Sequence, residues 1–149
     1  MAMETDQVAK ARIVVVDQES EHWALLSLKN AEGKRKHGKL EMLGGHVGQD
    51  ESPLEALIRE LGEEEQTRFL SERVRTLEPE PLTLHAGGAL HHLFELEISE
   101  QEFTGLRHDP KESLGFELVR MSELEAGEHW DRITWRTQRI LEALAERRS

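Results

Sequence analysis

The sequence predicts an α/β fold in which a mixed β-sheet lies between helices. Two observations support this prediction: strand-like apolar segments occur near the start of the chain and again around residues 89–98, and amphipathic helical segments follow residues 52 and 132. Strands and helices that alternate along a chain are typical of layered α/β folds. The 149 residues fit a single domain, residues 1–149, which is long enough to bury about 70% of its unfolded surface.

The first third of the chain is expected to form strands. Residues 1–9 include the polar run Glu4–Gln7, so we expect an irregular polar end there. The run Ile13–Val16 is aliphatic throughout, which indicates a buried strand, and the polar residues 18–22 would form the turn to a hairpin partner. Gly44 and Gly45 would follow the third strand as a turn with positive φ. The expected strands are residues 11–17, 23–28 and 40–43.

Local rules place the start of the first helix. Ser52 is a good N-cap, Pro53 suits the first helical position, and Glu55 completes a Ser-x-x-Glu capping box. We therefore expect the helix to begin at Pro53. The apolar stripe that would face the core consists of Leu54, Leu57, Ile58 and Leu61.

The second half contains one clear strand and one clear helix. Residues 89–98 alternate with period two, which predicts a half-buried strand with Leu90, Phe94, Leu96 and Ile98 on the buried face. Residues 67–77 fit neither period well. The other expected elements are an extended segment at 78–83, a loop at 99–112, a strand at 116–120, a helical turn at 122–125 and a helix from 133 to near the end.

Composition limits the class of partner and the compartment. A formal charge of −11 argues against nucleic-acid polymers, because proteins that bind them need a basic footprint. No apolar run is long enough to span a membrane, so we expect no membrane partner. We also expect no signal segment and a cytoplasmic protein, and the lack of Cys excludes disulfides. The oligomeric state stays open, a homodimer included.

A basic run before the glycine turn could bind an anion. Residues 34–39 read Lys-Arg-Lys-His-Gly-Lys, and Lys36 and Lys39 are our candidate contacts for the phosphates of a small nucleotide-type substrate. The alternative is an ordinary solvated hairpin loop.

The helix after Ser52 concentrates acid on one face. At about 100° per residue, Glu60, Glu63 and Glu64 lie together. Each exposed like-charged pair costs a helix only about 0.2–0.5 kcal/mol, so a solvated acidic face is one interpretation. The other is a divalent metal site, because carboxylate oxygens suit Mg²⁺ or Mn²⁺.

The spacing of the whole segment resembles a known signature. Residues 45–64 read Gly-x5-Glu-x7-Arg-Glu-Leu-x-Glu-Glu. This resembles the Nudix hydrolase signature Gly-x5-Glu-x7-Arg-Glu-U-x-Glu-Glu-x-Gly-U, in which U is a bulky aliphatic residue, and every charged position matches. The departures are Gln66 in place of Gly, Thr67 in place of the last aliphatic residue, and Leu43 where Pro often precedes the glycines. They affect the turn and the helix end rather than the charged residues.

The resemblance implies a fold, a reaction and a set of roles. It implies an α/β/α sandwich and the hydrolysis of a diphosphate linkage in a nucleoside diphosphate derivative. The implied cofactor is Mg²⁺, with Mn²⁺ as the alternative. Glu51 and Arg59 would form a structural pair. Glu60 is the first choice for the catalytic base, Glu112 the second and Glu117 the third. The implied metal ligands are Glu60, Glu63, Glu64 and the Gly45 carbonyl.

The substrate is less closely defined. The chain has no Tyr, unlike family members that hydrolyse diadenosine polyphosphates, and Pro81 is near but not at the spacing found in those acting on ADP-ribose. We therefore expect a nucleoside triphosphate pyrophosphatase, with nucleotide sugars or ADP-ribose as alternative substrates. A further alternative is a non-catalytic nucleotide-binding regulatory module, although the complete acidic set favours an enzyme.

Overall fold

The computed structural model describes residues 6–148. No helix in that range is long and apolar enough to cross a membrane. The strands are β1 (Asp6–Val16), β2 (His22–Lys29), β3 (Leu40–Glu41), β4 (Leu43–His46), β5 (Leu82–Ala86), β6 (Ala89–Ser99) and β7 (Ser113–Arg120). The helices are α1 (Pro53–Glu64), α2 (Phe69–Leu77), α3 (Glu100–Thr104), α4 (Met121–Glu125) and α5 (Trp135–Arg148), with a 3-10 turn at Trp130–Arg132.

The seven strands form one mixed sheet in which two strands change neighbours along their length. β1 pairs in parallel with β6, and the other pairings are antiparallel. On its opposite edge, β1 pairs with β4 over residues 8–11 and with β2 over residues 13–16. β2 then leaves β1 and pairs with β3 through residues 27–28. The pairs β1–β4 and β2–β3 therefore diverge, and a space opens between them.

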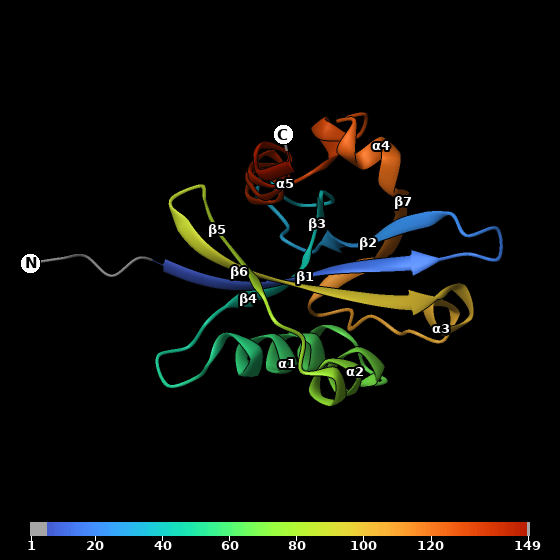
Figure 1. Ribbon diagram of the computed structural model, residues 1–149, viewed down its shortest axis with the longest axis horizontal. Coiled ribbons are helices and arrows are strands. Elements are labelled where there is room, and N and C mark those ends of the chain that lie inside the picture. The colour runs from blue at the N-terminus through green and yellow to red at the C-terminus, as the bar shows by residue number, and fades with distance from the viewer. Residues whose placement is uncertain (1–5, 149) are drawn as a thin grey trace, which may run out of the picture.

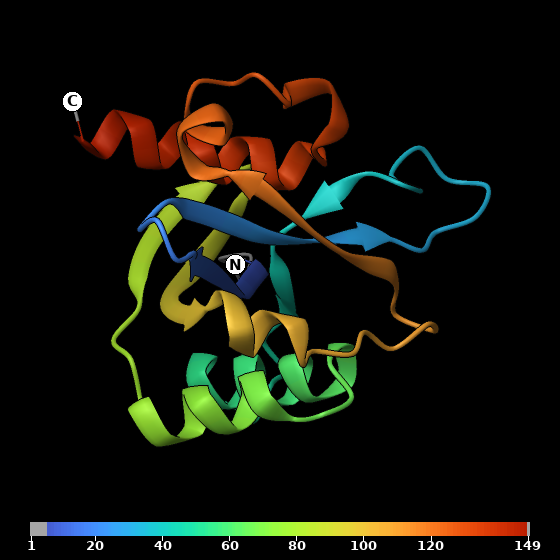
Figure 2. The same cartoon turned by 90° about the vertical axis from the view of Figure 1, so that its right-hand side faces the viewer.

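Helices cover both faces of the sheet, as Figures 1 and 2 show. The helices α1 and α2 cover one face, where Leu57, Leu61, Leu70 and Val74 are buried against the sheet. The helices α4 and α5 cover the other face through a second apolar cluster that includes Ile140. The α/β/α sandwich and mixed sheet implied by the sequence are confirmed, with one apolar cluster on each side of the sheet.

The predicted alternation in β6 is correct only for its second half. Phe94, Leu96 and Ile98 are buried on the α1 side, as expected. In the first half, Leu90 is only partly buried, whereas His91 and Leu93 of the opposite face are buried. The second apolar cluster, which contains Leu93, covers this end of the strand, so its second face is not solvated there.

Several boundaries differ from the expected ones for identifiable reasons. Residues 6–9 belong to β1 because they pair with β4 and β6, so the prediction of an irregular end is wrong for them, while residues 1–5 lie outside the described range. The expected loop at 99–112 contains α3, whose capping box joins Ser99 and Glu102. The last helix begins at Trp135 because Ile133 is extended and bridges to Leu40.

The end of α1 depends on a buried carboxylate. Glu65 is fully buried, and its side chain accepts hydrogen bonds from the backbone N–H groups of Thr67, Phe69 and Arg107 and from the Thr67 hydroxyl. The Gln66 N–H donates to the Arg107 carbonyl at 2.7 Å. The left-handed residue in this turn is Arg68, with φ of 66°. Gln66 therefore does not need the conformational freedom of the glycine that the family signature has there.

A buried ion cluster joins the strands where they diverge. The Glu41 carboxylate of β3 lies 2.9 Å from the Lys29 ammonium of β2 and 3.8 Å from the Lys10 ammonium of β1. Lys10 is 4% exposed and also donates to the Met42 carbonyl. Burial raises the pKa of Glu41, but the charges of Lys10 and Lys29 outweigh it and hold the pKa below 4.5.

We expect Glu65→Gln to lower the free energy of unfolding by about 2–3 kcal/mol, since the amide supplies one acceptor to several donors and adds donors of its own. Urea titration of both proteins measures the difference. Glu72→Gln on the exposed face of α2 is the control and should change stability by less than about 0.5 kcal/mol. Equal effects of the two substitutions would contradict the structural role of Glu65.

We expect the stability gap between wild type and Glu41→Gln to depend on pH. The folded pKa of Glu41 is depressed, so the ionised carboxylate stabilises the fold fully above pH 4.5, and this contribution is lost as pH falls through the lower folded pKa. Removal of one partner from a buried ion cluster costs about 3–5 kcal/mol at neutral pH. Urea titrations from pH 7 to pH 3 measure the gap, and a gap that stays constant over this range would refute the assignment.

Candidate active site

A polar cavity of about 310 Å³ lies where the strand pairs diverge. Strand residues form most of its wall: Val8, Lys10, Ser27, Lys29, Glu41, Gly44, Gly45 and His46. Ser113, the first residue of β7, also lines it, and residues outside the strands complete the wall: Lys36, Glu60, Glu64, Glu112 and Arg136. Two larger hollows, between α2 and α3 and between α4 and α5, contain none of the predicted catalytic, metal-binding or substrate-binding residues.

The two glycines of β4 bring the strand into close contact with α1 and β1. A Cβ atom on Gly45 would lie 2.5 Å from the Glu60 carboxyl group. Gly44 has φ of +125°, and a Cβ there would lie 2.1 Å from the Ala9 carbonyl oxygen. Because backbone atoms cannot move aside as a flexible side chain can, a side chain at position 44 is incompatible with this strand pairing.

Glu60 and Glu64 face the cavity from α1. The Gly44 N–H donates to the Glu64 carboxylate, at 3.2 and 3.3 Å from its two oxygens. Burial raises the pKa of Glu64 to about 8, and the nearby Glu60 adds to the rise, while Lys10 opposes it. Positive charge thus does not fully compensate the buried carboxylate of Glu64. A bound cation is one way in which that compensation can be supplied.

Arg59 connects the loop after β4 to the helix. Its Nε and Nη2 atoms donate to the two Glu51 oxygens at 3.1 and 2.6 Å, and Nη2 also donates to the His46 carbonyl. Its Nη1 atom donates to Glu60 at 3.0 Å and to Glu63 at 3.4 Å. The bond from Arg59 lowers the pKa of Glu51, whose Oε1 also accepts the Gly48 N–H at 2.7 Å. The predicted pairing of Glu51 with Arg59 is therefore present.

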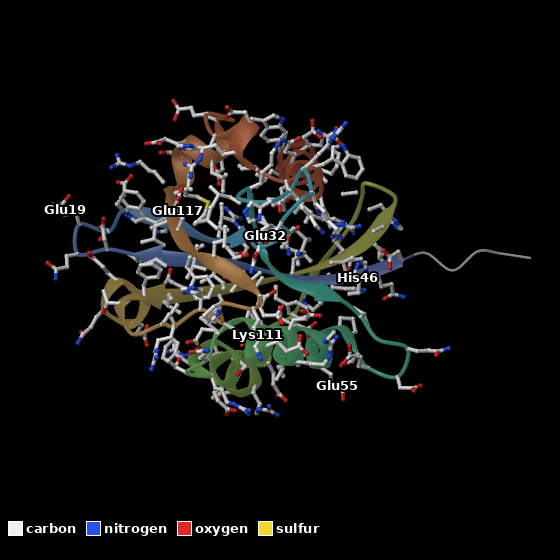
Figure 3. The ribbon with its side chains drawn as sticks, turned by 180° about the vertical axis from the view of Figure 1, so that it is seen from behind. Glu19, Glu32, His46, Glu55, Lys111 and Glu117 are labelled. Carbon is white, nitrogen blue, oxygen red and sulfur yellow. The ribbon has the colours of Figure 1, made fainter. Side chains whose placement is uncertain are left out.

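Figure 3 looks onto this edge of the molecule from behind. It shows β4, with His46 labelled, above α1, with Glu55 labelled, and Lys111 marks the loop that leads into β7. Glu112 follows in that loop, where it is exposed and lines the cavity. Partial desolvation and the nearby charges of Glu63 and Asp109 raise the pKa of Glu112.

The structure brings most of the predicted site residues together, but not all of them. The residues that line the one cavity are Gly45, Glu60, Glu64, Glu112 and Lys36. Glu63 is exposed and bonds to Arg59 instead, and Lys39 is partly buried away from the cavity. Glu117 pairs with Arg132 at 2.6 Å and is not part of the wall.

Sequence reasoning missed four charged wall residues: Lys10, Lys29, Glu41 and Arg136. One signal was available, because the polar residues Lys10 and Arg12 alternate with Ala9, Ala11 and Ile13 at period two, which would have extended the first strand toward residue 8. Arg136 carried no such signal. It reaches the cavity from the last helix, more than seventy residues after Glu64.

The side chains in residues 6–148 contain no group of three or more His, Cys, Asp or Glu that could hold a metal ion as they stand. The donor chemistry nevertheless suits a hard cation. Mg²⁺ takes few carboxylates and completes its shell with waters and substrate phosphates. Glu60 and Glu64 in one cavity, with incomplete charge compensation, meet that requirement.

Solved structures share this fold at low sequence identity. The bifunctional NMN adenylyltransferase/ADP ribose pyrophosphatase of Francisella tularensis, complexed with AMP and Mn ion, matches with a TM-score of 0.69 at 15% identity over 99% of this chain and 43% of that one. The chain thus spans less than half of that protein. The MutT protein of Methanosarcina mazei matches with a TM-score of 0.58 at 14% identity over 99% of each chain. The NUDIX domain of Shewanella oneidensis NrtR, complexed with ADP ribose, matches with a TM-score of 0.62 at 12% identity over 99% and 91%.

These structural matches show the fold alone, and no curated protein matches the chain in sequence. The family model described as NUDIX domain matches residues 7–138, which includes the β4 glycines, all of α1 and Arg136. Members of that family hydrolyse nucleoside diphosphate derivatives and generally use divalent metals. The chain therefore belongs to the Nudix hydrolase family.

Proposed function

We propose that this protein is a Mg²⁺-dependent hydrolase that cleaves a diphosphate linkage. Its favoured substrates would be nucleoside triphosphates, on which it would act as a pyrophosphatase. One observation carries the proposal: the carboxylates of Glu60 and Glu64 and a group of basic side chains line the same cavity. Phosphoryl chemistry needs both, because the attacking water must be activated and the negative charge of the phosphates must be neutralised.

Glu60, Glu64 and the Gly45 carbonyl are the proposed metal ligands. When bound, Mg²⁺ or Mn²⁺ would supply Lewis acidity and a more acidic water. Gly45 supports this assignment because the absence of a side chain leaves the Glu60 carboxyl group against the strand. Glu63 stays a predicted ligand; in its present position it bonds to Arg59.

The side chains of the protein have separate tasks in this proposal. Arg59 is a positioning residue, since it bonds to Glu60 from one side and to the 46–51 loop from the other. Glu60 is the first candidate to accept a proton from the attacking water, and Glu112 is the second because it lines the same cavity. Lys36 is the proposed contact for a substrate phosphate, whereas Lys39 lies away from the cavity.

Two alternatives use the same cavity. Nucleotide sugars or ADP-ribose could replace triphosphates, and the Shewanella domain was solved with ADP ribose bound. A non-catalytic nucleotide-binding regulatory module is the other alternative. The retention of Glu60 and Glu64 at the cavity favours the enzyme, because a binding module needs no acidic pair beside its phosphate site. A cytoplasmic location, a single domain over residues 1–149 and a homodimer remain predictions.

We expect Glu64→Gln to reduce Mg²⁺-dependent turnover by roughly 100-fold or more, because a metal-binding carboxylate is lost. Release of phosphate and diphosphate from a panel of triphosphates, ADP-ribose and sugar nucleotides measures the effect and locates the bond that is cleaved. Glu72→Gln on α2 is the control for general loss of negative charge. Full metal-dependent activity in Glu64→Gln would show that the mechanism is wrong.

The general base can be identified by comparing Glu60→Gln with Glu112→Gln. If Glu60 is the base, its substitution lowers kcat by about 100-fold or more, and Glu112→Gln lowers it by less than about tenfold. Steady-state kcat and single-turnover rates from pH 5 to pH 9, measured for both variants and for wild type, give these effects. A flattened acidic limb in Glu112→Gln, together with an unchanged profile in Glu60→Gln, would reverse the assignment.

A further inference from the structure

We propose that the side of the cavity opposite Glu60 and Glu64 binds a phosphate additional to the diphosphate that is cleaved. The enzyme would then prefer substrates with three or more linked phosphates over diphosphates joined to an uncharged sugar. This inference rests on the proposed function and narrows its substrate class. It is carried by Arg136 of α5, Ser113 of β7, and the charges around them.

Arg136 presents a buried cationic donor without a partner. Its Nη1 atom is inaccessible to solvent, and no residue in the described range 6–148 accepts a hydrogen bond from it. A buried charged donor that stays unpaired is costly, and most such groups in folded proteins have a partner. Because Arg136 lines the cavity, an anion bound there would supply the missing acceptor.

Ser113 is a second buried polar residue without a hydrogen-bond partner among the described residues, and it lies on β7. It is 2% exposed, and its hydroxyl finds no hydrogen-bond partner in the part of the chain that the structure describes. Ser113 also lines the cavity. Two unpaired polar groups from distant segments, one on β7 and one on α5, therefore border the same space. A ligand with several acceptor oxygens can satisfy both.

The start of α5 is held firmly against the strands, so the position of Arg136 is built into the fold. The Thr134 N–H donates to the Leu40 carbonyl, and the Thr137 hydroxyl accepts the Met42 N–H. On the other side, Trp135 packs over Gly87, where a Cβ atom would lie 2.9 Å from the indole ring. Arg136 lies between these contacts along the helix.

The charges on this side are mainly positive. Lys10 and Lys29 already share the carboxylate of Glu41. The charge of Lys36 also acts on Glu41, whereas Arg136 forms no salt bridge within the part of the chain that the structure describes. Four cations thus line the cavity with Glu41, and the other wall carboxylates are Glu60, Glu64 and Glu112. His91 cannot neutralise Arg136, because an imidazole is either neutral or positively charged, and its Nε2 is already bonded to the Ala86 carbonyl.

The wall suits a phosphate better than a nucleobase. No Phe, Tyr or Trp side chain lines the cavity among the described residues, and Val8 is its one aliphatic side chain. The imidazole of His46 is the one ring in the wall, and it lies on β4, away from the α5 layer. The α5 side therefore offers a base no stacking surface. Arg136 also approaches from the α5 layer, whereas Glu60 and Glu64 approach from the α1 layer on the opposite face of the sheet (Figure 2). A diphosphate at the two carboxylates would therefore leave Arg136 for a further phosphate.

The test compares ATP and GTP with ADP-ribose and UDP-glucose in wild type and Arg136→Gln. We expect wild type to prefer the triphosphates, and Arg136→Gln to raise KM for them by roughly 10- to 100-fold while changing kcat/KM for the sugar-linked diphosphates by less than about threefold. Arg136→Lys should recover part of the loss. Arg139→Gln is the matched control, because Arg139 lies on the same helix, pairs with Glu142 and does not line the cavity.

A binding measurement separates this inference from the proposed hydrolysis. Calorimetry with inorganic tripolyphosphate and Mg²⁺ should show binding to wild type and to Arg139→Gln, and binding weakened by roughly 10-fold or more in Arg136→Gln. That result supports the inference even if no substrate in the panel is hydrolysed. Equal losses for all four substrates, a wild-type preference for the sugar-linked diphosphates, or unchanged tripolyphosphate affinity in Arg136→Gln would overturn it.

Discussion

The backbone of β4 lies so close to β1 that no side chain fits at Gly44, and on its other side a Cβ atom at Gly45 would displace the Glu60 carboxyl group. This contact determines where the acidic face of α1 meets the sheet. Arg59 also holds α1 against β4, because its guanidinium bonds both to the His46 carbonyl at the end of β4 and to Glu60 of α1. Two glycines and one arginine thus set the position of the carboxylates before any ligand binds.

The cavity exists because β1 and β2 separate before they end. Their pairing covers residues 13–16 of β1 only, after which each strand takes a different partner. A gap of this kind would normally fill with apolar side chains, but here it contains Lys10, Lys29 and Glu41. Removing such charges from water is costly, and their mutual attraction offsets part of the cost. The fold therefore keeps an ionic cluster at a position where an apolar core would close the site.

The sequence predicted local features more successfully than long-range ones. The start of α1 at Pro53 followed from Ser52 and Glu55, whose capping box is present in the structure. The same signal at Ser99 and Glu102 was overlooked, because the polar composition of that segment suggested a loop. The boundaries of α2 could not be predicted, since Arg68 and Glu78 adopt left-handed conformations that few residues of their type take up.

The candidate site shows the same difference between local and long-range features. A contiguous motif contains Glu60, Glu64 and Gly45, so spacing alone brought them together. Lys10, Lys29 and Arg136 meet the motif only through strand pairing and through the packing of α5, which are tertiary events without a local pattern. At the departures from the signature, Gln66 needs no left-handed conformation, and Thr67 donates through its N–H and its hydroxyl to Glu65, which organises that turn.

Arg136 and the acidic residues of α1 belong to helices on opposite faces of the sheet, each with its own apolar cluster. In the proposed function these helices have separate tasks, since α1 supplies the two carboxylates and α5 supplies Arg136. Thr134 and Thr137 bond the start of α5 to the strands, so they belong to the scaffold of the site. A change at position 136 alone would then alter the recognised group and leave both the scaffold and the carboxylates in place.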